Sequence, residues 1–354
     1  MSGPFDAVVV GGGLAGLCVA YHLAAEGVTT VLVDRADAGR ATDAGAGILS
    51  PATAGVAAEL ALPCGEYYAE LAPQLGDDVG YGRCGLVSVA LADWDVEMFE
   101  ALLASAQGRG GVSEIEPEEA RRLFPALGTV TRALWNPTAC RVDGRVFSGA
   151  VRRAAVARGL EVVEGSVGRV APGSVTTDED TLSCGAVVIA GGAWSAATGR
   201  QLGVELPVTP ERGQIVHLAS GVDTSAWPIL SPVMGDYFVP WPDGRVVTGA
   251  TREAGAGFAA LPTVSGLRQI VNEVARVAPG LVDATIVDIR VGLRPASGDG
   301  RAILGEVVPG VFVATGYGAD GLLLSPWCGR EVASWVRGAT PPAWMSPYLV
   351  SRFV

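Results

Sequence analysis

Three glycines near the start of the chain have the spacing of a dinucleotide-binding turn. Gly11, Gly13 and Gly16 form the pattern G-x-G-x-x-G between an apolar run and a helix-like segment that starts with Leu14 and Ala15. In that context the first glycine makes the turn, the second lets the backbone approach a pyrophosphate, and the third lets the helix pack on the strand. The N–H groups at the helix start would face the phosphates. The pattern predicts a bound dinucleotide, with an ordinary tight turn as the structural alternative.

An acidic residue follows at the distance expected for ribose binding. Asp34 closes the second apolar run, 18 residues after Gly16. A carboxylate there can accept hydrogen bonds from ribose hydroxyls, and it disfavours the 2′-phosphate of NADP. The glycines and the acid alone do not separate FAD from NAD.

Three further segments favour FAD. Residues 39–51 are small and follow the acid directly, which suits backbone contact with a cofactor that continues past its pyrophosphate. Residues 190–192 (AGG) end another apolar run, where a side chain would block a cofactor lying over the sheet edge. Residues 315–321 (TGYGADG) lead into a helix with Asp320 as its expected N-cap. Such a helix start, aimed at the flavin pyrimidine ring, would stabilise the negative charge of the reduced ring.

The elements that would position these residues follow the order of a doubly wound sheet. Strand-like runs at 6–10 and 30–33 flank a helix at 14–26, and similar runs recur later. These lie at 160–163, 186–190 and 310–314, before a last helix at 321–336. We therefore predict an α/β chain: a Rossmann-type FAD-binding domain and a discontinuous second α+β substrate domain. The first is expected to comprise residues 1–75, 141–204 and 291–354, and the second residues 76–140 and 205–290.

Composition narrows the classes of partner. A formal charge of -12, from 25 basic and 37 acidic residues, argues against nucleic acid and anionic membranes. No apolar stretch approaches the length of a spanning helix, and the N-terminus has no leader pattern, so a cytoplasmic, soluble protein is expected. Six cysteines form no C-x-x-C pair and only two histidines accompany them. This predicts reduced thiols and no metal site.

At this point the chain resembles the D-amino-acid oxidase and glycine oxidase family of FAD-dependent amine oxidoreductases. The resemblance spans nearly the whole length, through VVVGGGLAGLCVAYHLAAEGVTTVLVD, ATDAGAGILSP, VVIAGGAWS, GDYFVPW, VVTGAT, VGLRPASGDGRAILG and GYGADGLLLSPWCG. The first and third motifs are shared by many flavoproteins, whereas the combination of GLRP with the late glycine loop is more specific.

The resemblance assigns roles to individual positions. Arg294 of GLRP matches the arginine that pairs with the substrate carboxylate, and Tyr237 matches a tyrosine that binds the same group or closes the pocket. An arginine suits that role because its planar fork meets both carboxylate oxygens. Val167 matches a residue whose backbone contacts adenine. The residues expected to hold the cofactor are Gly11, Gly13, Leu14, Ala15, Gly16, Asp34, Arg35, Thr42, Asp43, Ala46, Gly47, Ile48, Val167, Gly192, Trp194, Gly318, Asp320, Gly321 and Leu322.

The resemblance also implies a reaction. FAD would oxidise an amino acid or related carboxylate-bearing amine to an imine by hydride transfer to flavin N5. O2 would then reoxidise the reduced flavin and give H2O2. The alternatives are a dehydrogenase that passes electrons to a quinone or carrier, and a specialised-pathway oxidase acting on a cyclic or secondary amine. An NAD-dependent reductase and a non-catalytic flavin-binding protein are less favoured.

Two departures from the family pattern bear on the expected chemistry. Glycine oxidases carry a basic residue in the late loop, and this chain has Ala319 there, which leaves substrate identity and oxygen reactivity open. No cysteine lies at the position that tethers flavin in sarcosine oxidases, so non-covalent FAD is expected. His22 and His217 are interpreted as structural.

Overall fold

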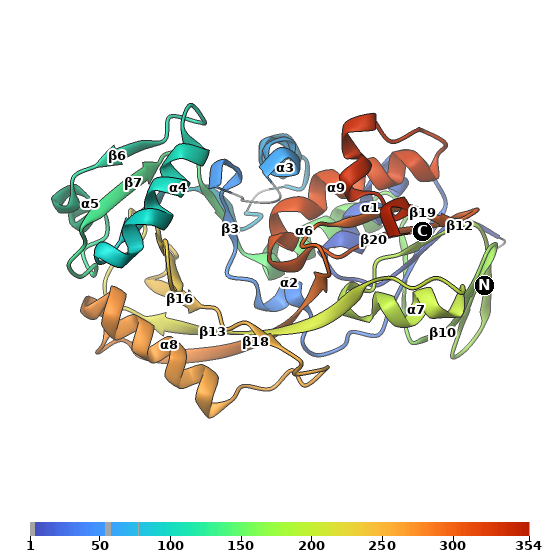
Figure 1. Ribbon diagram of the computed structural model, residues 1–354. Helices are drawn as coiled ribbons and strands as arrows, with labels where there is room; N and C mark the ends of the chain where they lie inside the picture. The colour runs from blue at the N-terminus through green and yellow to red at the C-terminus, as the bar shows by residue number, and fades with distance from the viewer. Residues whose placement is uncertain (1–3, 54–57, 77, 354) are drawn as a thin grey trace.

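The first sheet is built around five parallel strands. The computed structural model describes residues 4–53, 58–76 and 78–353. The parallel strands lie in the order β9 (Glu161–Glu164), β2 (Thr30–Asp34), β1 (Phe5–Val10), β12 (Thr181–Ile189) and β20 (Val311–Thr315). Figure 1 labels β12 and β20 of this set. Three antiparallel strands complete this eight-stranded sheet: β19 (Ile303–Val308) on β20, and the hairpin of β10 (Val167–Ala171) and β11 (Ser174–Thr177) on β12.

The central strand of this sheet is buried on both faces. Ala7 and Val9 of β1 belong to one apolar core, and Val8 and Val10 belong to another, as the two-residue period of a strand requires. Helices cover the first face: α1 (Leu14–Ala25), α3 (Ala58–Leu71), α6 (Gly144–Val156) and α9 (Gly321–Val336). On the other face lies α7 (Ser195–Gln201). This sandwich fixes the carboxyl ends of β1 and β12 at one edge, where the glycine turn lies.

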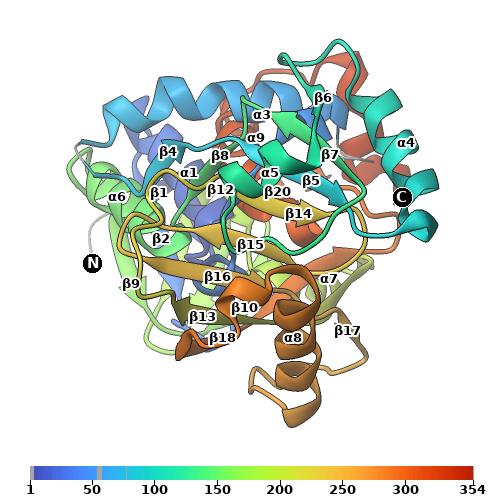
Figure 2. The same cartoon turned by 90° about the vertical axis from the view of Figure 1, so that its left-hand side faces the viewer.

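The second sheet has nine strands and is mainly antiparallel. Its order is β17 (Glu253–Ala254), β13 (Val208–Ala219), β16 (Arg245–Gly249), β15 (Tyr237–Pro240), β14 (Ile229–Pro232), β5 (Leu86–Ala90), β7 (Arg132–Asn136) and β6 (Ser113–Ile115), with β18 (Thr285–Ser297) also paired to β13. The helices α4 (Val96–Ala106), α5 (Pro117–Leu123) and α8 (Val264–Val277) accompany it. Figure 2 shows β14, β15, β16 and β13 one below another, with α8 beneath them.

Two long strands connect the second sheet with the region of the first. β13 and β18 pair antiparallel from Val208↔Ser297 to Ala219↔Thr285, and they run together across the molecule (Figure 1). The short helix α2 (Ala41–Ala44) contacts β18. A small third sheet of β3 (Ile48–Leu49), β8 (Cys140–Val142) and β4 (Tyr81–Arg83) lies alongside. The pairing carries residues of β13 and β18 to the edge of the first sheet.

The elements expected from the sequence are present in the expected order. The last helix has the predicted bounds, and the first helix ends at Ala25 instead of residue 26. Each predicted strand is present, and its observed last residue lies within two residues of the predicted one. The two domain boundaries stay a prediction. All six cysteines are unpaired, but Cys84 and Cys184 are only half-buried. Within the described ranges, no helix is long and apolar enough to cross a bilayer, and no cluster of side chains has the make-up of a metal site.

Candidate active site

One cavity collects most of the residues singled out in the sequence. It has a volume of about 670 Å³, and its wall contains residues from both large sheets. All of the predicted site residues line it except Gly16 and Asp43. The predicted cofactor side and the predicted substrate side are therefore parts of one continuous space.

The glycine turn leaves no room for side chains at two of its three positions. Gly11 has φ +109°, and a Cβ there would lie 2.5 Å from the carbonyl oxygen of Ala190. A Cβ on Gly16 would lie 2.0 Å from the carbonyl oxygen of Gly11, so Gly16 acts in helix-to-strand packing beneath the cavity wall. Gly13 faces open space apart from Thr42 at 3.6 Å. A phosphate-sized group can therefore approach the backbone at Gly13.

Asp34 is held by the protein through both carboxylate oxygens. Its Oδ1 accepts a hydrogen bond from the backbone amide of Gly12 at 3.0 Å, and its Oδ2 forms an ion pair with Arg40. The carboxylate thus stabilises the glycine turn as well as lining the cavity, and its contact with a ribose stays a prediction. Arg35 also lines the cavity and pairs with Asp37 at 2.6 Å. Sequence reasoning missed Arg40, because no motif marks a basic residue six positions after the acid.

The segment after Asp34 completes the start of α1. The hydroxyl of Thr42 accepts a hydrogen bond from the backbone amide of Leu14 at 3.0 Å. This satisfies one of the donors that a helix start leaves without an intrahelical partner. Ala46, Gly47 and Ile48 line the cavity further along. Asp43 lies outside the wall.

The late glycine loop borders the same cavity but differs from the prediction at one residue. Gly318, Ala319, Gly321 and Leu322 line the wall, as do Val167, Gly192 and Trp194. Asp320 occupies the N-cap position of α9, yet its carboxylate makes no capping bond, so the predicted capping role is wrong. The side chain instead lines the cavity, where burial raises the pKa of Asp320 and the nearby Arg252 cation opposes that shift.

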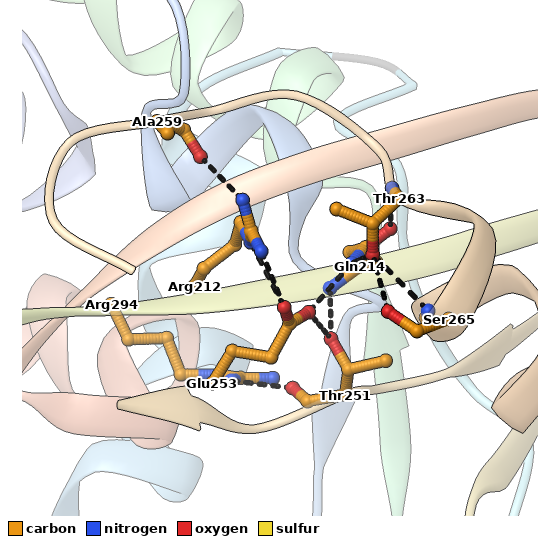
Figure 3. Close-up of polar contacts among 9 residues, drawn as sticks. Arg212, Gln214, Thr251, Glu253, Ala259, Thr263, Ser265 and Arg294 are labelled. Carbon is orange, nitrogen blue, oxygen red and sulfur yellow. Dashed lines mark hydrogen bonds and ion pairs between the residues drawn. The ribbon is translucent and has the colours of Figure 1, made fainter. Parts of the chain in front are cut away.

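Arg294 is anchored through one of its terminal nitrogens. It lies on β18 directly opposite Glu211 of β13. Its Nη1 donates to Glu211 Oε1 at 2.9 Å. The same nitrogen donates to the carbonyl oxygen of Thr251 at 3.0 Å, as Figure 3 shows. The side chain is only 14% exposed, and its guanidinium lies so close to Gly213 that a Cβ there would be 2.7 Å from Cζ. Because both contacts use Nη1, Nε and Nη2 are not engaged by them.

Tyr237 lies beside this arginine at the start of β15. Burial raises the pKa of Tyr237, and the neighbouring Arg294 cation partly offsets that shift. The hydroxyl is therefore neutral and able to donate a hydrogen bond over the physiological pH range. Tyr237 and Arg294, on which the substrate-site prediction rested, therefore lie near each other in the wall of one cavity.

A second arginine in the cavity wall was not found from the sequence. Arg252 lines the cavity with 66% of its side chain exposed, and its Nη1 lies 3.5 Å from Glu211 Oε1, the oxygen that also accepts from Arg294. It lies in a connecting segment without a recognisable motif. Two cations thus share one carboxylate oxygen at this end of the cavity.

The two histidines lie outside the cavity wall. Burial lowers the pKa of His22 to about 4, helped by Arg330, and burial likewise lowers that of His217 to about 4, helped by Arg290. Both imidazoles are therefore neutral near pH 7. This fits their interpretation as structural residues.

A glycine turn at the carboxyl edge of a parallel sheet, sharing one cavity with a second sheet, defines a dinucleotide-binding α/β protein. Comparison with known families makes this specific. Residues 6–335 match the model of the family described as FAD dependent oxidoreductase, so the chain belongs to that family. Membership confirms the resemblance found in the sequence and decides between FAD and NAD in favour of FAD.

Individual relatives match over almost the whole chain. The uncharacterized oxidoreductase YurR of Bacillus subtilis is 33% identical over 96% of this chain and 97% of its own length. The crystal structure of iminodiacetate oxidase from Chelativorans sp. BNC1 has a TM-score of 0.92 and 32% identity, covering 97% of this chain and 98% of that one. Glycine oxidase from Geobacillus kaustophilus also has a TM-score of 0.92, with 27% identity and full coverage of both chains. The predicted α/β fold with FAD-binding and substrate domains is thereby confirmed.

Proposed function

We propose that this protein oxidises a carboxylate-bearing amine with non-covalently bound FAD. The observation that supports this proposal most strongly is the position of Arg294. One of its nitrogens is fixed by Glu211 and Thr251, and the residue lines the same cavity as the glycine turn. An anchored guanidinium is a suitable partner for a substrate carboxylate because it presents a planar pair of donors in a set direction. A cytoplasmic location accompanies this proposal.

The residues present fit an FAD molecule. The pyrophosphate would lie at the open face of Gly13, and the adenosine ribose near Asp34, which is already fixed by Gly12. The flavin end would be held by the late glycine loop from Gly318 to Leu322. Bound there, FAD would supply the oxidising chemistry of the family, as the acceptor of a hydride from the amine.

The chain's own part in the reaction is positioning. Arg294 holds the carboxylate and so fixes the direction of the α-carbon, and the neutral Tyr237 hydroxyl donates to the same group. The resulting imine is hydrolysed by water to an oxo acid and ammonia when the amine is primary. A substrate that binds as the neutral amine needs no dedicated general base, which agrees with histidines that lie outside the wall.

For the electron acceptor we propose O2, with H2O2 as product; a dehydrogenase that uses a quinone or carrier is the alternative. Two structural relatives, iminodiacetate oxidase and glycine oxidase, are oxidases, which supports O2 as the acceptor. The test mixes the holoenzyme anaerobically with glycine, iminodiacetate, and D- and L-amino acids, and follows loss of flavin absorbance. Admission of O2 should then restore the oxidised spectrum and yield one H2O2 for each substrate consumed. Bleaching without reoxidation would support the dehydrogenase, and no bleaching by any amine would contradict the proposal.

Arg252 favours a narrower candidate, a secondary amine that carries two carboxylates. Its side chain lines the cavity beside Glu211, which it shares with Arg294, so a second carboxylate could bind there while Arg294 holds the first. Iminodiacetate, named in the relative from Chelativorans, has this form. Arg252→Gln should then weaken the binding of iminodiacetate strongly and that of glycine little. Equal effects on both compounds would contradict this candidate.

A further inference from the structure

The carboxylate of Glu253, which Thr251 links to Arg294, accepts four hydrogen bonds. Oε1 of Glu253 accepts from the Thr251 hydroxyl and from Gln214 Nε2, both at 2.6 Å. Oε2 accepts from Arg212 Nε at 3.1 Å and Nη2 at 2.6 Å. Figure 3 shows these side chains converging on Glu253. Burial disfavours ionisation, but the bonds from Arg212, Thr251 and Gln214 outweigh it and hold the pKa of Glu253 below its usual value.

Only an ionised carboxylate can satisfy this arrangement. All four groups that contact it, from three residues, are donors, and a carboxylate is an acceptor at both oxygens. A glutamine at position 253 would turn its NH₂ group toward one of two sets of donors. These are the guanidinium of Arg212, or the hydroxyl of Thr251 together with the side-chain amide of Gln214. In either orientation at least two donors would lose their acceptor, and leaving buried donors unpaired is costly.

Thr251 connects this carboxylate to Arg294. The residue is 1% exposed, and each of its polar groups is bonded. Its backbone amide donates to the backbone carbonyl of Gln214 at 3.2 Å. Its hydroxyl accepts from the backbone amide of Gln214 at 3.0 Å and donates to Glu253. Its carbonyl accepts from Arg294 Nη1 at 3.0 Å. The direction of that carbonyl therefore depends on the bonds that Glu253 and Gln214 make to the same residue.

The same group of residues fixes the segment that follows β17. Arg212 Nη1 donates to the carbonyl of Ala259 at 3.2 Å, and Gln214 bonds both to the amide of Thr263 (2.8 Å) and to its hydroxyl (2.9 Å). Phe258, directly before Ala259, stacks on Trp194, with ring centroids 5.4 Å apart, and Trp194 lines the cavity. The network thus spans from the substrate arginine to the predicted cofactor wall.

We propose that Glu253 is a positioning residue for substrate binding: through Thr251 it sets the direction in which Arg294 presents its guanidinium to a substrate carboxylate. Glu253 does not line the cavity, so its effect passes through another residue. This inference rests on the proposed function, because it takes Arg294 as the carboxylate-binding group. It predicts that Glu253 affects substrates with a free carboxylate and leaves other substrates alone.

The test compares Glu253→Gln with the wild-type holoenzyme in two measurements. Acetate, the simplest carboxylate, is titrated against the flavin absorbance spectrum, and its Kd should rise about tenfold in the variant. Anaerobic flavin reduction is then measured with the amino acid that reduces the wild type fastest and with its ethyl ester. The apparent Kd for the acid should rise by a similar factor, with no change for the ester, which offers Arg294 no carboxylate.

Glu114→Gln is the matched control. Glu114 also pairs through both oxygens with an arginine, Arg132, on β6 and β7 away from the cavity, so its loss should leave both titrations unchanged. If Glu253→Gln fails to fold, Thr251→Val and Thr251→Ser carry the test. The valine variant removes the hydroxyl and should raise the acetate Kd, and the serine variant should recover most of the affinity.

Two outcomes would overturn the inference. One is an unchanged acetate Kd in Glu253→Gln; the other is an equal loss for the acid and for its ester, which a merely structural role would give. A double variant with Arg294→Gln should lose no more affinity than Arg294→Gln alone, because both act on one contact. A wild-type flavin that responds to neither acetate nor any amino acid would instead contradict the proposed function.

Discussion

Asp236 is a buried carboxyl group whose ionisation should destabilise the fold. It immediately precedes Tyr237, is 5% exposed, and its Oδ2 has no hydrogen-bond partner among the described residues. Burial, followed by the charge of Glu273, raises the pKa of Asp236 from 3.8 to about 6, although Arg276 opposes the shift. In the unfolded chain the group ionises at its ordinary value. We therefore expect Asp236→Asn to change how stability depends on pH.

The sign and the size follow from the two pKa values. Between pH 3.8 and about 6 the folded chain binds this proton and the unfolded chain has lost it, so the free energy of unfolding falls as pH rises. The stabilisation from this group is complete below pH 3.8 and is lost as pH passes about 6. About two pKa units correspond to about 3 kcal/mol. Asparagine does not ionise and lacks this contribution.

The assay is urea unfolding of both chains at pH 4, 5.5 and 7 with matched FAD content. The unfolding free energy of Asp236→Asn minus that of the wild type should increase by about 2.4 kcal/mol from pH 4 to pH 7, because a small part of the total is already lost at pH 4. Other titrating groups contribute equally to both chains and cancel in this difference. A difference that stays constant with pH would refute the reasoning.

Three further substitutions test other parts of the account. Gly11→Ala should lower the flavin-to-protein absorbance ratio of the purified protein, because its Cβ would meet the Ala190 carbonyl; normal FAD content would contradict this. Asp143→Ala removes the side chain that accepts from two amides at the start of α6, and should lower the unfolding free energy in urea by about 1 kcal/mol with unchanged FAD content. His22 stays neutral in the fold down to about pH 4, whereas in the unfolded chain it binds a proton below pH 6.5, so its stabilising contribution, up to about 3 kcal/mol, is lost as pH falls from 6.5 to 4. In urea unfolding, the stability of His22→Gln should therefore fall less than that of the wild type over this pH range. Equal falls in both proteins would refute the lowered pKa.

Much of the fold could be predicted from local sequence. The glycine turn, its helix and Asp34 lie within about thirty residues, and strand and helix periods are local properties. The bounds of α9 were predicted correctly for the same reason. Asp320 also lies at its N-cap as predicted, but without the capping hydrogen bond: the sequence shows an acid before a helix, but not that this residue would line a cavity.

The supporting residues of the substrate side could not be predicted in this way. Gln214 bonds to Glu253 across 39 positions and to Thr263 across 49, and these partners are adjacent only because the sheet and the segment after it bring them together. Arg252 has no motif either, and its role depends on which way its side chain points. Arg294 was found only because the family resemblance marked it, since its support by Glu211 is a cross-strand contact.

The central claim is that Arg294 holds the carboxylate of an amine beside FAD bound in the cavity. The most direct measurement is anaerobic flavin reduction in wild type and Arg294→Leu, with the fastest amino-acid substrate and its ethyl ester. Because the substrate carboxylate loses a buried charged partner, the apparent Kd of the amino acid should rise by about a hundredfold or more in the variant. The FAD content and the apparent Kd of the ester should stay unchanged. An acid that binds both proteins equally well would contradict the account.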